Sequence, residues 1–271
     1  MDIIIFVISL LTTIAVIPPI RDMLLSADIT EKNYKNNIIP VGMGITFIPV
    51  IIINAIVLRW FFRDDLDTLR LLLIFLAGVM TVMTMGLIDD LMGNRSTLGF
   101  RGHIKSLLKG RLTTGGLKAI VGGLISLLIG SLFSLDMIEI IVNALIIALF
   151  TNLINLLDLR PGRAIKGFLL ISILFIVIGL SGEIRVILIS SVAYAVACLP
   201  QDIKAKSMMG DVGSNALGAV LGITTAAGYD ITVKYIILGL LILIHIITEK
   251  YSLTKIIKKI FILDFFDKLG R

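Results

Sequence analysis

Charged residues are scarce in this chain of 271 residues: only 16% of the positions are Asp, Glu, Lys or Arg, whereas 57% are hydrophobic. A water-soluble domain has about 25% charged and about 45–50% apolar residues. The mean hydropathy of +1.04 excludes a single water-soluble core, because too few polar side chains remain to cover it. The composition therefore requires lipid as the solvent for most of the surface.

Cysteine and histidine are nearly absent, with one cysteine, Cys198, and two histidines. A single cysteine excludes an internal disulfide and leaves the redox compartment open. The net charge of +6 would suit nucleic acid, but the cations lie in short segments between apolar runs, where membrane topology accounts for them. We therefore predict a bilayer environment and no nucleic-acid partner.

Nine apolar runs approach the length of about 20 residues that a helix needs to cross the hydrocarbon core. They cover residues 3–20, 40–58, 69–88, 117–134, 138–157, 167–181, 184–200, 212–228 and 233–248. Lipid offers the backbone no hydrogen-bond partners and there is no barrel-like alternation, so every span must be helical. The first run has no basic n-region or cleavage site, and we expect it to be retained. The sequence predicts an all-α polytopic bundle of about nine spans, within a range of eight to ten.

The distribution of Lys and Arg predicts the orientation of these spans. Segments 21–39, 89–118, 158–166 and 201–211, together with the tail from 249, contain 20 of the 25 cations. Loops rich in cations lie on the cytoplasmic side. We therefore expect the N-terminus outside and the tail inside.

The chain divides into a membrane domain, 1–248, and a basic tail, 249–271. The tail has apolar residues at helical spacing, namely Leu253, Ile256, Ile257, Ile260 and Phe261, with Lys255, Lys258 and Lys259 on the opposite side. This pattern predicts an amphipathic helix at the cytoplasmic interface, with a plain surface anchor as its simplest role.

Two adjacent carboxylates, Asp89 and Asp90, close the third run. Neighbouring residues point about 100° apart around a helix, so we expect different roles: one could face a metal or a proton, and the other backbone donors or a basic partner. The alternative is a pair of interfacial acids that only ends the span. Downstream, His103 lies in a basic loop, and Lys118 in the next helix meets either lipid headgroups or a phosphate.

The fifth run ends with Asn152, Asn155 and Asp158, spaced three residues apart. This spacing places them within an arc of about 120° on one helix face. Such a polar stripe faces a cavity or the bundle interior. Hydrogen bonding between helices is the alternative for the asparagines, but a buried carboxylate requires a cation, a metal or a proton.

Two glycine-rich segments complete the set. Asp211 opens the eighth run in Gly210–Ser214, where its carboxylate can cap free amides or coordinate a cation. Gly42 and Gly44 follow Pro40 at the start of the second run and permit tight packing. Taken singly, each segment also reads as an ordinary helix start.

The predicted topology places all four segments at the same leaflet. Carboxylates combined with Lys and Arg, without clustered Cys or His, suit oxygen coordination of Mg²⁺ rather than a zinc site. A divalent cation with nearby cations neutralises charge on transferring phosphates. The sequence therefore predicts phosphoryl chemistry at the cytoplasmic face.

In their order, these segments resemble the polyprenyl-phosphate N-acetylhexosamine-1-phosphate transferases of the MraY and WecA type, which form glycosyltransferase family 4. The resemblance runs over about residues 29–222, and this chain looks like a divergent and shortened member. The matching motifs are Pro40–Gly44, Asp89-Asp90, Thr113–Lys118, Asn152/Asn155/Asp158 and Gly210–Ser214.

The resemblance implies that a polyprenyl phosphate attacks a UDP-sugar and yields a polyprenyl-diphosphate-sugar and UMP. It implies catalytic roles for Asp89, Asp90 and Asp158, and Mg²⁺ held by Asp211 and Asp90. We assign substrate binding to Asn152, Asn155, Lys118, Arg160, Arg163, Gly42, Gly44 and His103. The expected location is the plasma membrane of a bacterium, with a role in cell-envelope polysaccharide synthesis and a homodimer left open.

Two departures from the family pattern bear on the substrate. The loop reads Asp158-Leu159-Arg160-Pro161-Gly162, where the family has a second acid, and the large histidine-bearing loop is missing. A non-catalytic relative that binds a lipid-linked precursor or a partner protein is therefore the main alternative. A transporter with intramembrane acids is a further one, although the acids here fall at helix ends.

Overall fold

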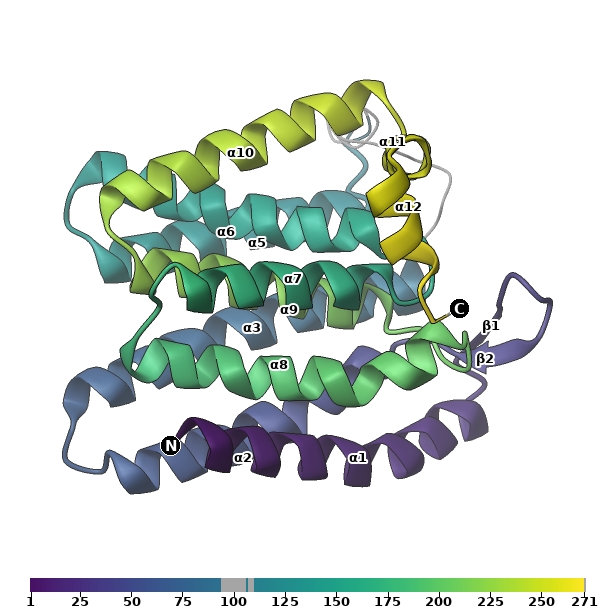
Figure 1. Cartoon of the computed structure of the whole chain (residues 1–271), viewed down its shortest axis with the longest axis horizontal. Coiled ribbons are helices and arrows are strands. Elements are labelled where there is room, and N and C mark those ends of the chain that lie inside the picture. The colour runs from purple at the N-terminus through teal and green to yellow at the C-terminus, as the bar shows by residue number, and fades with distance from the viewer. Residues whose placement is uncertain (94–105, 107–109, 271) are drawn as a thin grey trace.

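The structure, a computed structural model, describes residues 1–93, 106 and 110–270. Its elements are α1 Asp2–Ser26, β1 Thr30–Lys32, β2 Ile38–Pro40, η1 Met43–Thr46, α2 Phe47–Phe61, α3 Leu66–Met92, α5 Thr114–Phe133, α6 Met137–Leu157, α7 Arg163–Val177, α8 Gly182–Ile203, α9 Gly210–Gly228, α10 Ile231–Lys250, α11 Leu253–Lys259 and α12 Phe261–Lys268. The long helices lie side by side in a bundle (Figure 1). The prediction of an all-α polytopic membrane protein is confirmed.

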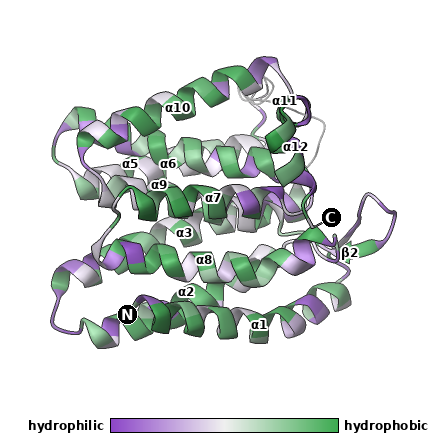
Figure 2. Cartoon of the chain, viewed as in Figure 1, coloured by the Kyte–Doolittle hydropathy of each residue, from purple (hydrophilic) through white to green (hydrophobic). Residues whose placement is uncertain are grey.

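Each of the nine predicted apolar runs falls on a helix of the described chain. Seven helical segments are long and apolar enough to cross a membrane: α1, η1 with α2, α3, α5, α6, α8 and α10. The other two are α7, which has 15 residues, and α9, which is enclosed by its neighbours. Hydrophobic residues cover the helices along their length, and hydrophilic ones gather toward the two ends of the bundle (Figure 2). The number of spans and their orientation stay predictions.

Helix α9 forms the centre of the bundle, and every residue from Val212 to Ala226 is buried. Its small residues allow the neighbouring backbones to come close. A Cβ on Gly218 would lie 2.5 Å from the Phe150 carbonyl oxygen, and one on Gly222 would lie 2.5 Å from Ile147 Cα, both on α6. Close approach through small residues drives helix packing in lipid. It fixes the position of the α9 N-terminus, where Asp211 lies.

One end of the bundle, here called the site end, collects the polar segments. There α3, α6 and α8 end and α5, α7 and α9 begin, next to the hairpin of β1 and β2 (Figure 1). Thr113 begins α5 at this end, because its hydroxyl accepts a hydrogen bond from the Gly116 amide at 3.0 Å. The cap sets the direction in which Lys118 leaves the first turns of α5.

The tail differs from its prediction as one amphipathic helix. Ile260 has extended backbone angles (φ −100°, ψ 110°) and separates α11 from α12. Ile257 on α11 is buried, so part of the predicted apolar stripe faces protein. The two helices run across the direction of the bundle helices at the site end (Figure 1).

Candidate active site at the site end

Lys118 joins two carboxylates from different helices. Its Nζ lies 3.0 Å from Asp89 Oδ2 at the end of α3, and it also forms an ion pair with Asp211 Oδ2 at the start of α9. The three side chains are 22–28% exposed, so the cluster is reachable from outside but shielded from bulk water. Two carboxylates share one ammonium group, which leaves a net negative charge. Such a cluster attracts a further cation.

Asp90 has different partners from its neighbour Asp89. Its Oδ1 accepts the Asp211 amide at 2.9 Å, and its Oδ2 accepts the Val212 amide at 3.1 Å. A carboxylate of α3 thereby caps the free N–H groups of α9, where the helix dipole favours negative charge. Gly210 allows this contact, because a Cβ there would overlap Asp90 Oδ2. Asp90 therefore positions Asp211, and the predicted difference between the paired acids is visible in their contacts.

Asn155, in the last turn of α6, completes the cluster. We assign its amide so that Nδ2 donates to Asp211 Oδ1 at 3.1 Å and Oδ1 accepts from Lys118 Nζ at 3.2 Å, which satisfies both ends. The side chain then orients the carboxylate and the ammonium group together. Asn152, one turn earlier, is exposed.

The glycine segment before α2 contacts the backbone that leads into α9. The Met43 amide donates to the Met208 carbonyl at 3.1 Å, and the Gly44 amide donates to the Met209 carbonyl at 2.9 Å. A Cβ on Gly44 would overlap the backbone of Gly213. Gly42 has a positive φ of 77°, which suits glycine. The structure thus shows a packing role for Gly44, and the predicted substrate contact of both glycines stays a prediction.

Asp158 lies immediately after α6 and is partly buried. Burial raises the pKa of its carboxyl well above the usual range, and the negative charge of Asp202 adds to the shift. Asp202 is itself buried at the end of α8, and its Oδ2 accepts the Gly162 amide at 2.6 Å. It therefore fixes the end of the loop that contains Asp158.

The two loop arginines are placed differently. Arg160 is exposed. Arg163 is only 4% exposed and forms a bidentate pair with Asp267 of α12, with Nε–Oδ1 at 2.7 Å and the second contact at 3.0 Å. Its remaining nitrogen donates to Thr254 at 3.0 Å. These donors bind the tail in this structure, and substrate binding by Arg163 stays a prediction. His103 lies outside the described residues.

Sequence reasoning missed two buried polar residues at the site end of the bundle. The first is Asp202, and its only signal was a carboxylate inside an otherwise apolar helix end. The second is Asn215, which lies one turn after Asp211, is 2% exposed, and has an Nδ2 without a partner among the described residues. Residues four apart share a helix face, so Asn215 lies below Asp211 toward the membrane interior.

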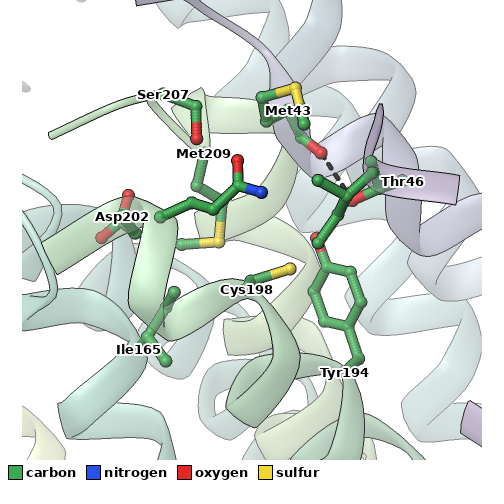
Figure 3. A pocket seen from close by; sticks show the side chains of 10 residues that line it. Met43, Thr46, Ile165, Tyr194, Cys198, Asp202, Ser207 and Met209 are labelled. Carbon is green, nitrogen blue, oxygen red and sulfur yellow. Dashed lines mark hydrogen bonds between the residues drawn. The ribbon is translucent and has the colours of Figure 1, made fainter. Parts of the chain in front are cut away.

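A small cavity adjoins the loop on the side of α8. Figure 3 shows Asp202 and Met209 on one wall and Thr46 and Tyr194 on another. The hydroxyl groups of Thr46 and Tyr194 lie 3.2 Å apart. The cavity thus connects the Asp202 end of the loop with the glycine segment before α2.

The oxygen donors of the cluster fit Mg²⁺ better than a metal that needs nitrogen or sulfur. Within the described part of the chain, no three Asp, Glu, His or Cys side chains converge on a point. Mg²⁺ commonly binds through one or two carboxylates together with substrate phosphates and water. Asp89 and Asp211 meet that requirement once Lys118 turns toward a phosphate.

A bundle of apolar helices with an acid and lysine cluster at one end defines a polytopic membrane protein with a charged interfacial site. The pattern of glycosyl transferase family 4 matches residues 72–229. The match covers more than half of the chain and includes Asp89, Lys118, Asn155 and Asp211. The chain therefore belongs to glycosyl transferase family 4, and no curated protein matches it. Membership supports a membrane transferase that passes a phospho-sugar to a lipid carrier.

Proposed function

We propose that this protein transfers a sugar-1-phosphate from a UDP-N-acetylhexosamine to undecaprenyl phosphate with the help of Mg²⁺. The reaction takes place at the cytoplasmic leaflet of a bacterial plasma membrane and supplies a lipid-diphosphate-sugar for cell-envelope polysaccharides. The observation that carries the proposal is the bridge of Lys118 between Asp89 and Asp211. It joins a carboxylate pair and a cation at one end of the bundle, where we expect the lipid–water boundary and both substrates to meet.

In this reaction, an oxygen of the lipid phosphate attacks the β-phosphorus of the donor. A new P–O bond forms, and the bond from the β-phosphorus to the oxygen it shares with the α-phosphorus breaks. That electron pair leaves with UMP. Mg²⁺ would neutralise charge on the diphosphate and stabilise the leaving oxygen.

The described residues have separable tasks in this scheme. Asp211 and Asp89 would supply carboxylate oxygens for Mg²⁺, and Asp89 would also accept a proton from a lipid phosphate that arrives protonated. Lys118 turns from the carboxylates to a phosphate oxygen, which offsets the negative charge of the two substrates. Asn155 keeps Asp211 oriented, and Asp90 holds the start of α9 in place.

The direct test is turnover by purified protein in lipid nanodiscs. The assay supplies undecaprenyl phosphate, Mg²⁺ and a panel of nucleotide sugars that includes donors without uridine. We expect equal amounts of released UMP and butanol-extractable lipid product from at least one UDP-N-acetylhexosamine. Absence of both products from every donor would refute the proposal.

The loop contacts favour one other function, that of a non-catalytic relative. Pro161 stands where the family has an acid, and Arg163 binds the tail, so the donor side of the site is altered. Such a protein would retain the cluster of Lys118, Asp89 and Asp211 to bind a lipid-linked precursor. Replacement of Asp211 by Asn in the native host separates the two functions, because an enzyme loses its cellular role and a binding protein retains it.

A further inference from the structure

The last helix has an apolar side that no part of the described chain covers. The most exposed apolar residues of α12 and its C-cap are Phe261, Ile262, Phe265, Phe266 and Leu269, each between 51% and 83% exposed, whereas Leu263 is 41% exposed. At 100° per residue they occupy an arc of about 140° on one side of α12. Asp267 points the opposite way and is buried. The helix is therefore bound to protein through Asp267, and its aromatic side is open.

Strong polar contacts hold the buried side of α12 to the beginning of α7. Arg163 and Asp267 form a bidentate pair in which the side chains are 4% and 7% exposed. Lys166 Nζ donates to the carbonyls of Phe266, Asp267 and Leu269 at 2.8 to 3.0 Å, where the helix dipole favours a cation. The start of α7 follows directly on the loop 158–162. Any displacement of α12 is therefore transmitted to that loop.

The chemistry around the open side favours an anionic lipid surface as its partner. Exposed lysines flank α12, namely Lys250, Lys255, Lys258, Lys259 and Lys268. The helix runs across the bundle at the site end, beside the ends of α7 and α10 (Figure 1). This is the direction of a helix that lies in the plane of a membrane. Aromatic residues with adjacent lysines bind anionic interfaces through combined apolar and electrostatic contacts.

We propose that α12 inserts its aromatic side into an anionic lipid interface, and that the Arg163–Asp267 pair ties this contact to the loop 158–162. The tail then couples the lipid surface to the loop beside the active site. This inference does not depend on the proposed transfer reaction, because fluorescence, proteolysis and hydrogen exchange are measured without turnover.

The lipid contact is tested by tryptophan fluorescence in the full chain. The background is Trp60→Phe, which removes the only tryptophan, and the probe is Phe265→Trp. The matched control is Tyr34→Trp in the hairpin that projects beyond the bundle (Figure 1). In proteoliposomes with anionic lipid, we expect the probe at position 265 to emit at shorter wavelength and to be quenched by brominated lipid. Equal emission and equal lack of quenching at positions 265 and 34 would overturn the lipid contact.

The pair is tested with Asp267→Asn and, as a control on the same helix, Asp264→Asn. Asp264 forms an ion pair with Lys268. Both residues belong to α12, so this pair does not link α12 to α7. Removal of one partner leaves the buried Arg163 charge uncompensated, so we expect trypsin to cleave the tail at least ~10-fold faster in Asp267→Asn. Equal cleavage of the two variants would show that the pair does not hold the tail.

Coupling is measured by hydrogen exchange of the peptide 158–163 in neutral and anionic nanodiscs. We expect slower exchange in anionic lipid for the unsubstituted protein and for Asp264→Asn, and no lipid dependence for Asp267→Asn. Exchange that is independent of lipid charge in all three proteins would overturn the coupling.

Discussion

Asp90→Asn separates a positioning residue from a metal ligand. In the structure both carboxylate oxygens of Asp90 accept backbone amides, from Asp211 at 2.9 Å and from Val212 at 3.1 Å. Asparagine keeps one oxygen acceptor and turns an NH₂ group toward the other amide. The loss of one charge-assisted hydrogen bond costs about 1.5–3 kcal/mol, and the lost charge at the helix start adds about 0.3–1 kcal/mol. We therefore expect a total cost of about 2–4 kcal/mol.

The consequence for activity follows from the displacement of Asp211. A shift of about 1 Å in a catalytic group lowers turnover by about 100-fold, and we expect a loss of that order in kcat. Both oxygens of Asp90 already accept amides of α9, so we expect the Mg²⁺ concentration at half-maximal activity to stay unchanged. Asp211→Asn is the contrasting variant, in which the Mg²⁺ requirement should rise.

The assay is UMP release at several Mg²⁺ concentrations, with thermal unfolding of each variant in nanodiscs as the measure of stability. An Asp90→Asn enzyme with normal stability and a strongly raised Mg²⁺ requirement would refute this reasoning. Asp90 would then be a metal ligand, as the family resemblance implies, and its contacts with the α9 amides would give way when the metal binds.

Two further predictions concern charge in and near the cluster. Lys118→Met leaves the carboxylates of Asp89 and Asp211 without their shared cation, so turnover should fall by about 100-fold or more, as single-turnover product formation would show. Asp202→Asn removes a negative charge that helps to raise the pKa of Asp158. If Asp158 must be ionised, the enzyme loses activity as pH falls through the raised pKa of this carboxyl. Removal of the Asp202 charge lowers that pKa, so the acidic limb of the pH–rate profile should move to lower pH in this variant. An unchanged limb would show that ionisation of Asp158 does not limit the rate.

The apolar helices and the placement of the main cluster at one end of the bundle could be predicted from sequence, because both depend on local patterns. Apolar runs report the length of each helix, and the placement of Asp89, Lys118 and Asp211 follows from which end of a run they occupy. The glycines of Gly210–Ser214 also signal the close contacts that bring α9 to the centre of the bundle.

The contacts of the loop 158–162 and of the tail could not be predicted in the same way. Arg163 and Asp267 are 104 residues apart, and each is an ordinary surface residue in its local sequence. Only the docking of α12 on α7 buries both and makes them a pair. Asp202 similarly acquires its role from the Gly162 amide just before α7, and the break at Ile260 divides a stripe that has helical spacing.

Gly44→Ala tests whether the position of Asp211 depends on backbone packing as well as on charge. The added methyl group would overlap the Gly213 backbone, which cannot rotate away as a side chain can. Overpacking of this kind costs about 1–3 kcal/mol and should move η1 away from α9, although no charged group changes. Gly122→Ala is the matched control, since a Cβ there has no neighbour within 4 Å. We expect lower thermal stability and lower turnover for Gly44→Ala only. Equal behaviour of the two variants would mean that α9 is held by its contacts with α3 and α6, without help from the glycine segment.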